Sequence, residues 1–96
     1  MRTRFTERAI SDLEDIADFI AARSPRSAVR VRDAILRSLS VLTDFPRIGR
    51  LQDVENIRKL ITAYDFVVYY TVDAEADEIA ILTIQHPSRD REFNDL

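Results

Sequence analysis

The spacing of apolar residues changes at the segment FPRIGR (residues 45–50), and this change most restricts the possible folds. Before the segment, apolar residues recur every three or four positions, as on one face of an α-helix. After it, they alternate with a period of two or form short apolar runs, as in β-strands. Pro46 ends a helix, and Gly49 permits the turn that follows. The sequence therefore predicts an α+β fold in which helices precede most of the sheet.

Two helices are predicted before the break, after a short strand at Arg2–Phe5. Thr6 is a suitable N-cap for the first helix, which we expect to run to about Ala22. Serine and proline at 24–25 then provide the N-cap and first residue of a second helix, which we expect to run to about Thr43. Because the connection is so short, the helices should fold back as an antiparallel hairpin. The apolar stripes of the two helices are Ala9, Ile10, Leu13, Ile16, Ala17 and Ile20, and Ala28, Val31, Ile35, Leu39 and Leu42.

The second helix carries more apolar surface than one neighbour needs. Val29 and Leu36 lie seven residues apart, on a face next to the main stripe. Such a helix packs on both the first helix and a sheet, or stays partly open for a partner.

Three strands are predicted after the break. A polar loop runs through Asn56, and residues 57–62, 63–73 and 77–86 then have the composition of strands. The segment DAEAD (73–77) provides the hairpin turn between the last two. The predicted order is β-α-α-β-β-β, one domain spanning residues 1–96, with a helical hairpin packed on a mainly antiparallel sheet.

Tyr69 and Tyr70 are neighbours in a predicted strand, so their side chains point to opposite faces of the sheet. We expect one of them in the core. The other would either pack under a helix or be presented at the surface.

The composition excludes several kinds of chemistry. The chain has no cysteine, so disulfides and thiolate catalysis are excluded, and its one histidine excludes most histidine-based metal sites. We expect neither a metal nor a cofactor. Four acidic residues of the first predicted helix are interpreted as its solvated face: Asp12, Glu14, Asp15 and Asp18.

Charge and hydropathy restrict partners and location. Fourteen basic residues against seventeen acidic ones give a net charge of −3, without the basic surplus that usually holds a protein on nucleic-acid phosphate. The first residues, MRTRFTERAISD, lack the apolar region of a signal peptide, and no run approaches the roughly 20 apolar residues of a membrane span. We therefore expect a soluble cytoplasmic protein without membrane contact.

One constellation in the segment IQHPSRDR (84–91) allows a catalytic hypothesis. If the strands pair as predicted, Arg58 could approach His86 and Arg89 at a common edge of the sheet. A metal-independent ribonuclease needs a general base, a general acid and cations for the developing phosphate charge. The simpler alternative is that His86 caps the end of a strand, while the arginines are exposed or pair with nearby acids.

The order of motifs resembles the ParE branch of the RelE/ParE superfamily, toxins of bacterial type II toxin–antitoxin systems. The resemblance covers nearly the whole length. The matching segments are RFTERAISDLEDIADFIAARSP (4–25), FPRIGR (45–50), IRKL (57–60), FVVYYTVD (66–73) and ILTIQHPSR (81–89).

The resemblance implies a toxin held inactive by a cognate antitoxin. For ParE-like members the implied target is DNA gyrase, and for RelE-like members the implied activity is mRNA cleavage on the ribosome. Arg58 and Arg89 match basic residues of the RelE-type catalytic set. Leu60, Val67 and Asp95 stand where that set has a second lysine, a strand arginine and a late tyrosine. These departures favour the ParE-like alternative and a protein-binding toxin over an enzyme.

The expected assembly is a hetero-oligomeric toxin–antitoxin complex, in contact with DNA only through the antitoxin. A third hypothesis is a degenerate toxin-like module kept for complex formation. The candidate antitoxin contacts are Val29, Leu36, Leu39 and Tyr69. The candidate target contacts are Arg58, His86, Arg89 and Arg91.

Overall fold

A computed structural model of the chain describes residues 1–89, apart from the side chain of Arg89. The helices and strands are β1 (Arg2–Phe5), α1 (Glu7–Ala21), α2 (Pro25–Ser40), β2 (Arg50–Leu51), β3 (Arg58–Ile61), β4 (Val67–Asp73) and β5 (Glu78–Gln85). Short 3-10 turns are η1 (Val41–Thr43), η2 (Ala63–Asp65) and η3 (Pro87–Arg89).

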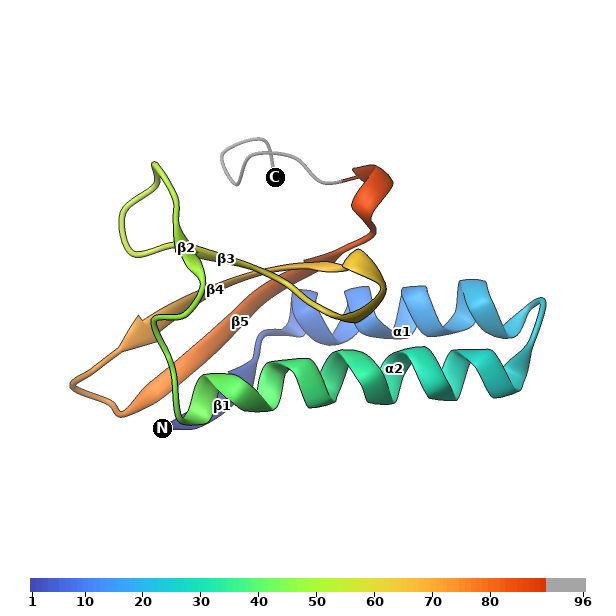
Figure 1. Cartoon of the computed structure of the whole chain (residues 1–96), viewed down its shortest axis with the longest axis horizontal. Coiled ribbons are helices and arrows are strands. Elements are labelled where there is room, and N and C mark those ends of the chain that lie inside the picture. Colours follow the sequence, from blue (N-terminus) through green and yellow to red (C-terminus); the bar gives the residue numbers. More distant parts are fainter. Residues whose placement is uncertain (90–96) are drawn as a thin grey trace.

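The two helices lie side by side along one face of the sheet (Figure 1). The five strands have the order β1-β5-β4-β3-β2, and only the pairing of β1 with β5 is parallel. The predicted α+β fold, a helical hairpin on a mainly antiparallel sheet, is confirmed. Within residues 1–89, neither helix combines the length and the apolar character needed to span a bilayer.

The helix starts follow from the predicted caps. The hydroxyl of Thr6 accepts a hydrogen bond from the N–H of Ala9, and Ser24 does the same for Ser27. At the other end, α2 stops at Ser40 and the chain continues as the turn η1, so the second helix is shorter than predicted.

Two parts of the sheet differ from the prediction. Strand β2 lies inside the segment predicted as a polar loop, because a strand of two exposed residues has no detectable alternation. The predicted strand 63–73 begins only at Val67, since η2 occupies its first residues. There Tyr64 and Asp65 have left-handed φ values of 58° and 64°, which bulky residues rarely adopt.

The main core lies between the helices and the sheet. The α2 stripe is buried as predicted, but Ile10 of the α1 stripe is 47% exposed. Full burial of one Val, Leu, Ile or Phe side chain contributes roughly 1.5–3 kcal/mol. The buried residues of this cluster are Ala9, Val31, Ile35, Leu39, Leu42, Phe66, Val68, Tyr70, Ile79, Ile81 and Ile84.

Tyr69 and Tyr70 are both fully buried, on opposite faces of β4. Tyr70 belongs to the core under the helices, whereas Tyr69 packs with Ile57 and Val67 in a second cluster. The prediction that only one of them is in the core was wrong. The opposite face has a small core of its own, because Ile57 and Val54 from the segment before β3 cover it.

Candidate functional site

Arg58 and His86 do not meet at one edge of the sheet. Both β3 and β5 pair antiparallel with β4, so they run in the same direction. Arg58 begins β3, level with Tyr70 and Ile81, whereas His86 follows the end of β5. These ends lie on opposite sides of Figure 1. At about 3.3 Å per residue, the distance from the level of Ile81 to His86 is roughly 16 Å along the strands, so the structure does not bring Arg58 and His86 together as the catalytic hypothesis supposed.

His86 closes the end of β5. Its exposed ring accepts a hydrogen bond at Nδ1 from the N–H of Ser88 (3.1 Å), and the Ser88 hydroxyl lies 2.7 Å from the same nitrogen. The ring also packs edge-on against Phe66, with the centroids 5.4 Å apart. Among the described residues, His86 forms no ion pair. The geometry agrees with the simpler alternative of a strand-end cap.

Of the remaining two target-contact candidates, one lies at the end of the described residues and the other lies outside them. The backbone of Arg89 closes the turn η3. Arg91 lies outside the described residues.

At the opposite end, Arg58 and Tyr70 hold the segment that precedes β2. The guanidinium of Arg58 donates from Nη1 to the carbonyl oxygens of Arg47 (3.1 Å) and Gly49 (2.9 Å). The hydroxyl of Tyr70 accepts from the N–H of Gly49 and donates to the carbonyl of Pro46, both at 2.8 Å. We call these four hydrogen bonds the loop clamp. Together they fix the backbone at residues 46–49.

The clamp also changes the titration of Tyr70. Burial raises the pKa of its hydroxyl above 10.0, while the bond from Gly49 and the charge of Arg58 oppose this shift. The hydroxyl is therefore neutral at physiological pH and able to donate to Pro46.

Gly49 is required by contact rather than by its backbone angles. No glycine in the chain has a left-handed φ, so the turn argument made from sequence does not apply. A Cβ at Gly49 would lie 2.6 Å from both Cε1 and Oη of Tyr70. Any larger residue would displace the tyrosine or the loop.

Asp12 has a role that its interpretation as a solvated residue missed. Its Oδ2 accepts from the Thr83 hydroxyl (2.6 Å) and from the N–H of Ile84 (3.0 Å). Strand β1 pairs with β5 only as far as Ile81. Beyond that point, the Asp12 carboxylate of α1 accepts the hydrogen bond from the N–H of Ile84, which has no strand on that side to bond.

A helical-spacing signal for this role was present in the sequence. Asp12 lies three residues after buried Ala9 and four before Ile16, which packs against the core. This spacing places its carboxylate on the inner side of α1. Glu14, Asp15 and Asp18 are exposed as predicted.

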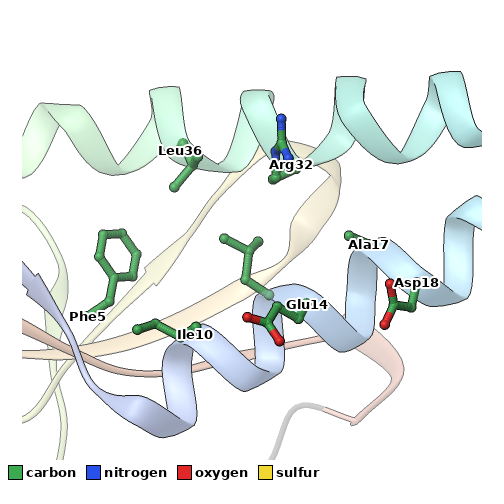
Figure 2. Close-up of a pocket in the computed structure, with 8 residues that line it drawn as sticks. Phe5, Ile10, Glu14, Ala17, Asp18, Arg32 and Leu36 are labelled. Atoms are coloured by element: carbon green, nitrogen blue, oxygen red, sulfur yellow. The ribbon is translucent and has the colours of Figure 1, made fainter.

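An open groove of about 590 Å³ lies between α1 and α2 (Figure 2). It has apolar walls, with Ile10 and Leu36 partly exposed within it. The charged side chains that line it differ between the helices. Glu14 and Asp18 project from α1, and Arg32 projects from α2. The lining residues are Phe5, Ile10, Leu13, Glu14, Ala17, Asp18, Arg32 and Leu36.

The antitoxin-contact candidates divide into surface and core residues. Val29 is 50% exposed and Leu36 is 37% exposed, both on α2. Leu39 and Tyr69 are buried in the two cores, so neither presents its side chain at the surface. In residues 1–89, no three His, Cys, Asp or Glu side chains are grouped so that they could bind a metal ion.

Comparisons with known proteins place this architecture in a family. The family model described as "ParE toxin of type II toxin-antitoxin system, parDE" matches residues 3–91. Toxin RelE2 of Caulobacter vibrioides is 31% identical over 86 residues, which are 88% of this chain and 93% of that protein.

Two solved structures share the fold. One, the chromosomal ParDE toxin–antitoxin system from P. aeruginosa, has a TM-score of 0.76 and 26% identity, covering 90% of this chain and 95% of that chain. The other, the intact E. coli RelBE toxin–antitoxin complex, has a TM-score of 0.69 and 18% identity, covering 94% and 98%. The chain belongs to the ParE toxin family of the RelE/ParE superfamily and is a toxin of the type II toxin–antitoxin class.

Proposed function

We propose that this toxin arrests growth by binding DNA gyrase in the cytoplasm, and that the cognate antitoxin that neutralises it binds the groove between α1 and α2. The observation that carries the binding mode is the separation of Arg58 from His86. Arg58 is engaged in the loop clamp and His86 in a turn at the other end of the strands, so these two residues do not together form the base and cation grouping that phosphate cleavage needs. Membership of the ParE family supports the choice of gyrase.

The groove fits one amphipathic helix from the antitoxin. An apolar stripe on that helix would cover Ile10, Leu13 and Leu36. Its orientation follows from charge, with basic side chains towards Glu14 on α1 and acidic ones towards Arg32 on α2. DNA would be contacted only through the antitoxin of the resulting hetero-oligomer.

Supercoiling of relaxed plasmid by purified gyrase tests the target. We expect micromolar toxin to inhibit supercoiling and an equimolar amount of antitoxin to restore it. Full supercoiling at micromolar toxin would contradict the proposal. Cleavage of mRNA at ribosomal A sites, abolished in His86→Ala, would instead favour a ribonuclease, and absence of growth arrest on induction would favour a degenerate module.

Affinity for the antitoxin tests the groove. Leu36→Glu should weaken binding by about tenfold or more, because it places a charge in an apolar contact. Glu14→Lys should weaken it less, and Asp15→Lys is the matched control, since Asp15 is exposed on α1 but does not line the groove. Equal effects of the two lysine variants would exclude this site.

A further inference from the structure

A second exposed apolar surface lies on the loop that the clamp holds. We call residues 45–51 the presented loop. Its three large apolar side chains are all mostly exposed: Phe45 is 60%, Ile48 56% and Leu51 59% exposed. None of them lines the groove between the helices, so this surface is separate from the proposed antitoxin site.

The presented loop is held in one conformation although its side chains face solvent. The four hydrogen bonds of the clamp attach its backbone at Pro46, Arg47 and Gly49 to side chains of β3 and β4. A loop fixed in this way loses little conformational entropy when a partner binds it. The arrangement is therefore typical of a preformed contact surface.

The charges of the loop indicate the chemistry of the partner. Arg47 and Arg50 alternate with the apolar residues, both are exposed, and neither forms an ion pair with any residue of 1–89. Two exposed arginines that pair with no acid in the described residues fit a partner surface that offers carboxylates.

Acidic residues beside the loop favour a protein partner over nucleic acid. Asp44, Asp53 and Glu55 are exposed within a few residues of it, and the net charge of the chain is −3. These charges repel a phosphate backbone, whereas a protein surface can place one or two carboxylates next to Arg47 and Arg50.

We propose that residues 45–51 form the surface with which the toxin holds its target protein, at a place where the target presents an apolar side chain flanked by Asp or Glu. This inference rests on the proposed function, because it supposes a protein target. It adds which part of the toxin makes the contact and what the contact requires of the target.

Two surface substitutions and one matched control test the proposal. Ile48→Ser removes an exposed apolar side chain, and Arg47→Glu reverses an exposed charge while keeping the carbonyl that Arg58 bonds. Ile61→Ser is the control, because Ile61 is 53% exposed and lies at the other end of β3. The readouts are the toxin dose that arrests growth and the Kd for purified antitoxin, with thermal melting to show that each variant is folded.

We expect each loop variant to need about tenfold or more toxin for arrest. Their Kd for antitoxin should stay within about twofold of wild type, because distant sites act independently. Ile61→Ser should match wild type in both assays. Arrest by folded Ile48→Ser and Arg47→Glu at the wild-type dose would overturn the proposal, as would an equal loss in Ile61→Ser.

The remaining outcomes separate this proposal from the choice of gyrase. If wild type arrests growth but does not inhibit supercoiling, gyrase is excluded, and the loop variants still decide the inference through growth arrest. A wild-type chain that causes no arrest would overturn both proposals. Binding of wild type to ribosomal RNA that is lost in Arg47→Glu would overturn the protein partner in favour of nucleic acid.

Discussion

The two ends of the central strands differ in how their polar residues are used. At the end where β3 begins, Arg58 and Tyr70 direct four hydrogen bonds to one loop, and Gly49 fits against the tyrosine ring. At the end where β5 finishes, His86 caps a turn at the surface and packs edge-on against Phe66. The first end holds a loop through four hydrogen bonds to partly or fully buried side chains, whereas the second is exposed and bonded locally.

The two ends carry two different sequence motifs, FPRIGR (45–50) and the segment around His86, and the role of each has to be tested separately. In the segment FPRIGR, the structure explains Gly49, because a Cβ there would lie 2.6 Å from Tyr70. The groups of Pro46 and Gly49 that Tyr70 bonds belong to the backbone. His86, in contrast, bonds locally within a turn and lies at the other end of the strands from Arg58. If the contrast holds, substitutions at the clamp should affect stability far more than substitution of His86.

Gly49→Ala should have the largest effect. The added methyl group would lie 2.6 Å from the Tyr70 ring, so the loop or the ring must move and the Gly49–Tyr70 bond is strained. We expect the free energy of unfolding to fall by about 2–4 kcal/mol, measured by urea denaturation. A change within about 0.5 kcal/mol would show that the clamp region is loosely held.

Tyr70→Phe should have the next largest effect. It keeps the ring but removes the hydroxyl, leaving the N–H of Gly49 without its buried partner. The expected loss is about 1–3 kcal/mol. Tyr64→Phe removes the same hydroxyl group from an exposed tyrosine. It is the control, and it should change stability little.

Alkaline pH should act on the same hydroxyl. Because the folded-state pKa of Tyr70 lies above 10.0, the unfolded chain loses this proton first as the pH rises. The contribution of Tyr70 is therefore complete below pH 10.0 and is lost as the pH rises towards the folded-state value. Denaturation at a series of alkaline pH values should show a steeper loss in wild type than in Tyr70→Phe, and parallel curves would contradict the assignment.

His86→Ala should have the smallest effect. The substitution removes one ring contact and a turn bond that water can replace, so we expect a loss of at most about 1 kcal/mol. The same denaturation experiment measures it. A loss as large as that of Gly49→Ala would remove the contrast between the two ends.

Much of the fold could be predicted because its signals are local. The helix starts depend on Thr6 and Ser24, and both form the expected cap bonds. Strand β2 and the left-handed Tyr64 could not be predicted, because pairing with β3 and the tertiary setting of the turn determine them. The second core beneath Tyr69 likewise depends on where a loop packs.

The candidate site was less predictable because it depends on the direction of the strands. The catalytic hypothesis needed Arg58 and His86 at one edge, whereas antiparallel pairing of both strands with β4 places the start of β3 and the end of β5 at opposite ends. The exposure of individual side chains was equally hard to predict. Leu36 and Leu39 are both apolar residues of α2, but only Leu36 reaches the surface. Asp12 is the exception, because helical spacing alone would have placed it inward.

Growth arrest on induced expression, with His86→Ala and Ile48→Ser compared in the same strain without antitoxin, tests most directly whether this toxin acts by holding a protein. We expect His86→Ala to arrest growth as wild type does, whereas folded Ile48→Ser should not. Loss of arrest in folded His86→Ala, with full arrest by Ile48→Ser, would contradict this expectation.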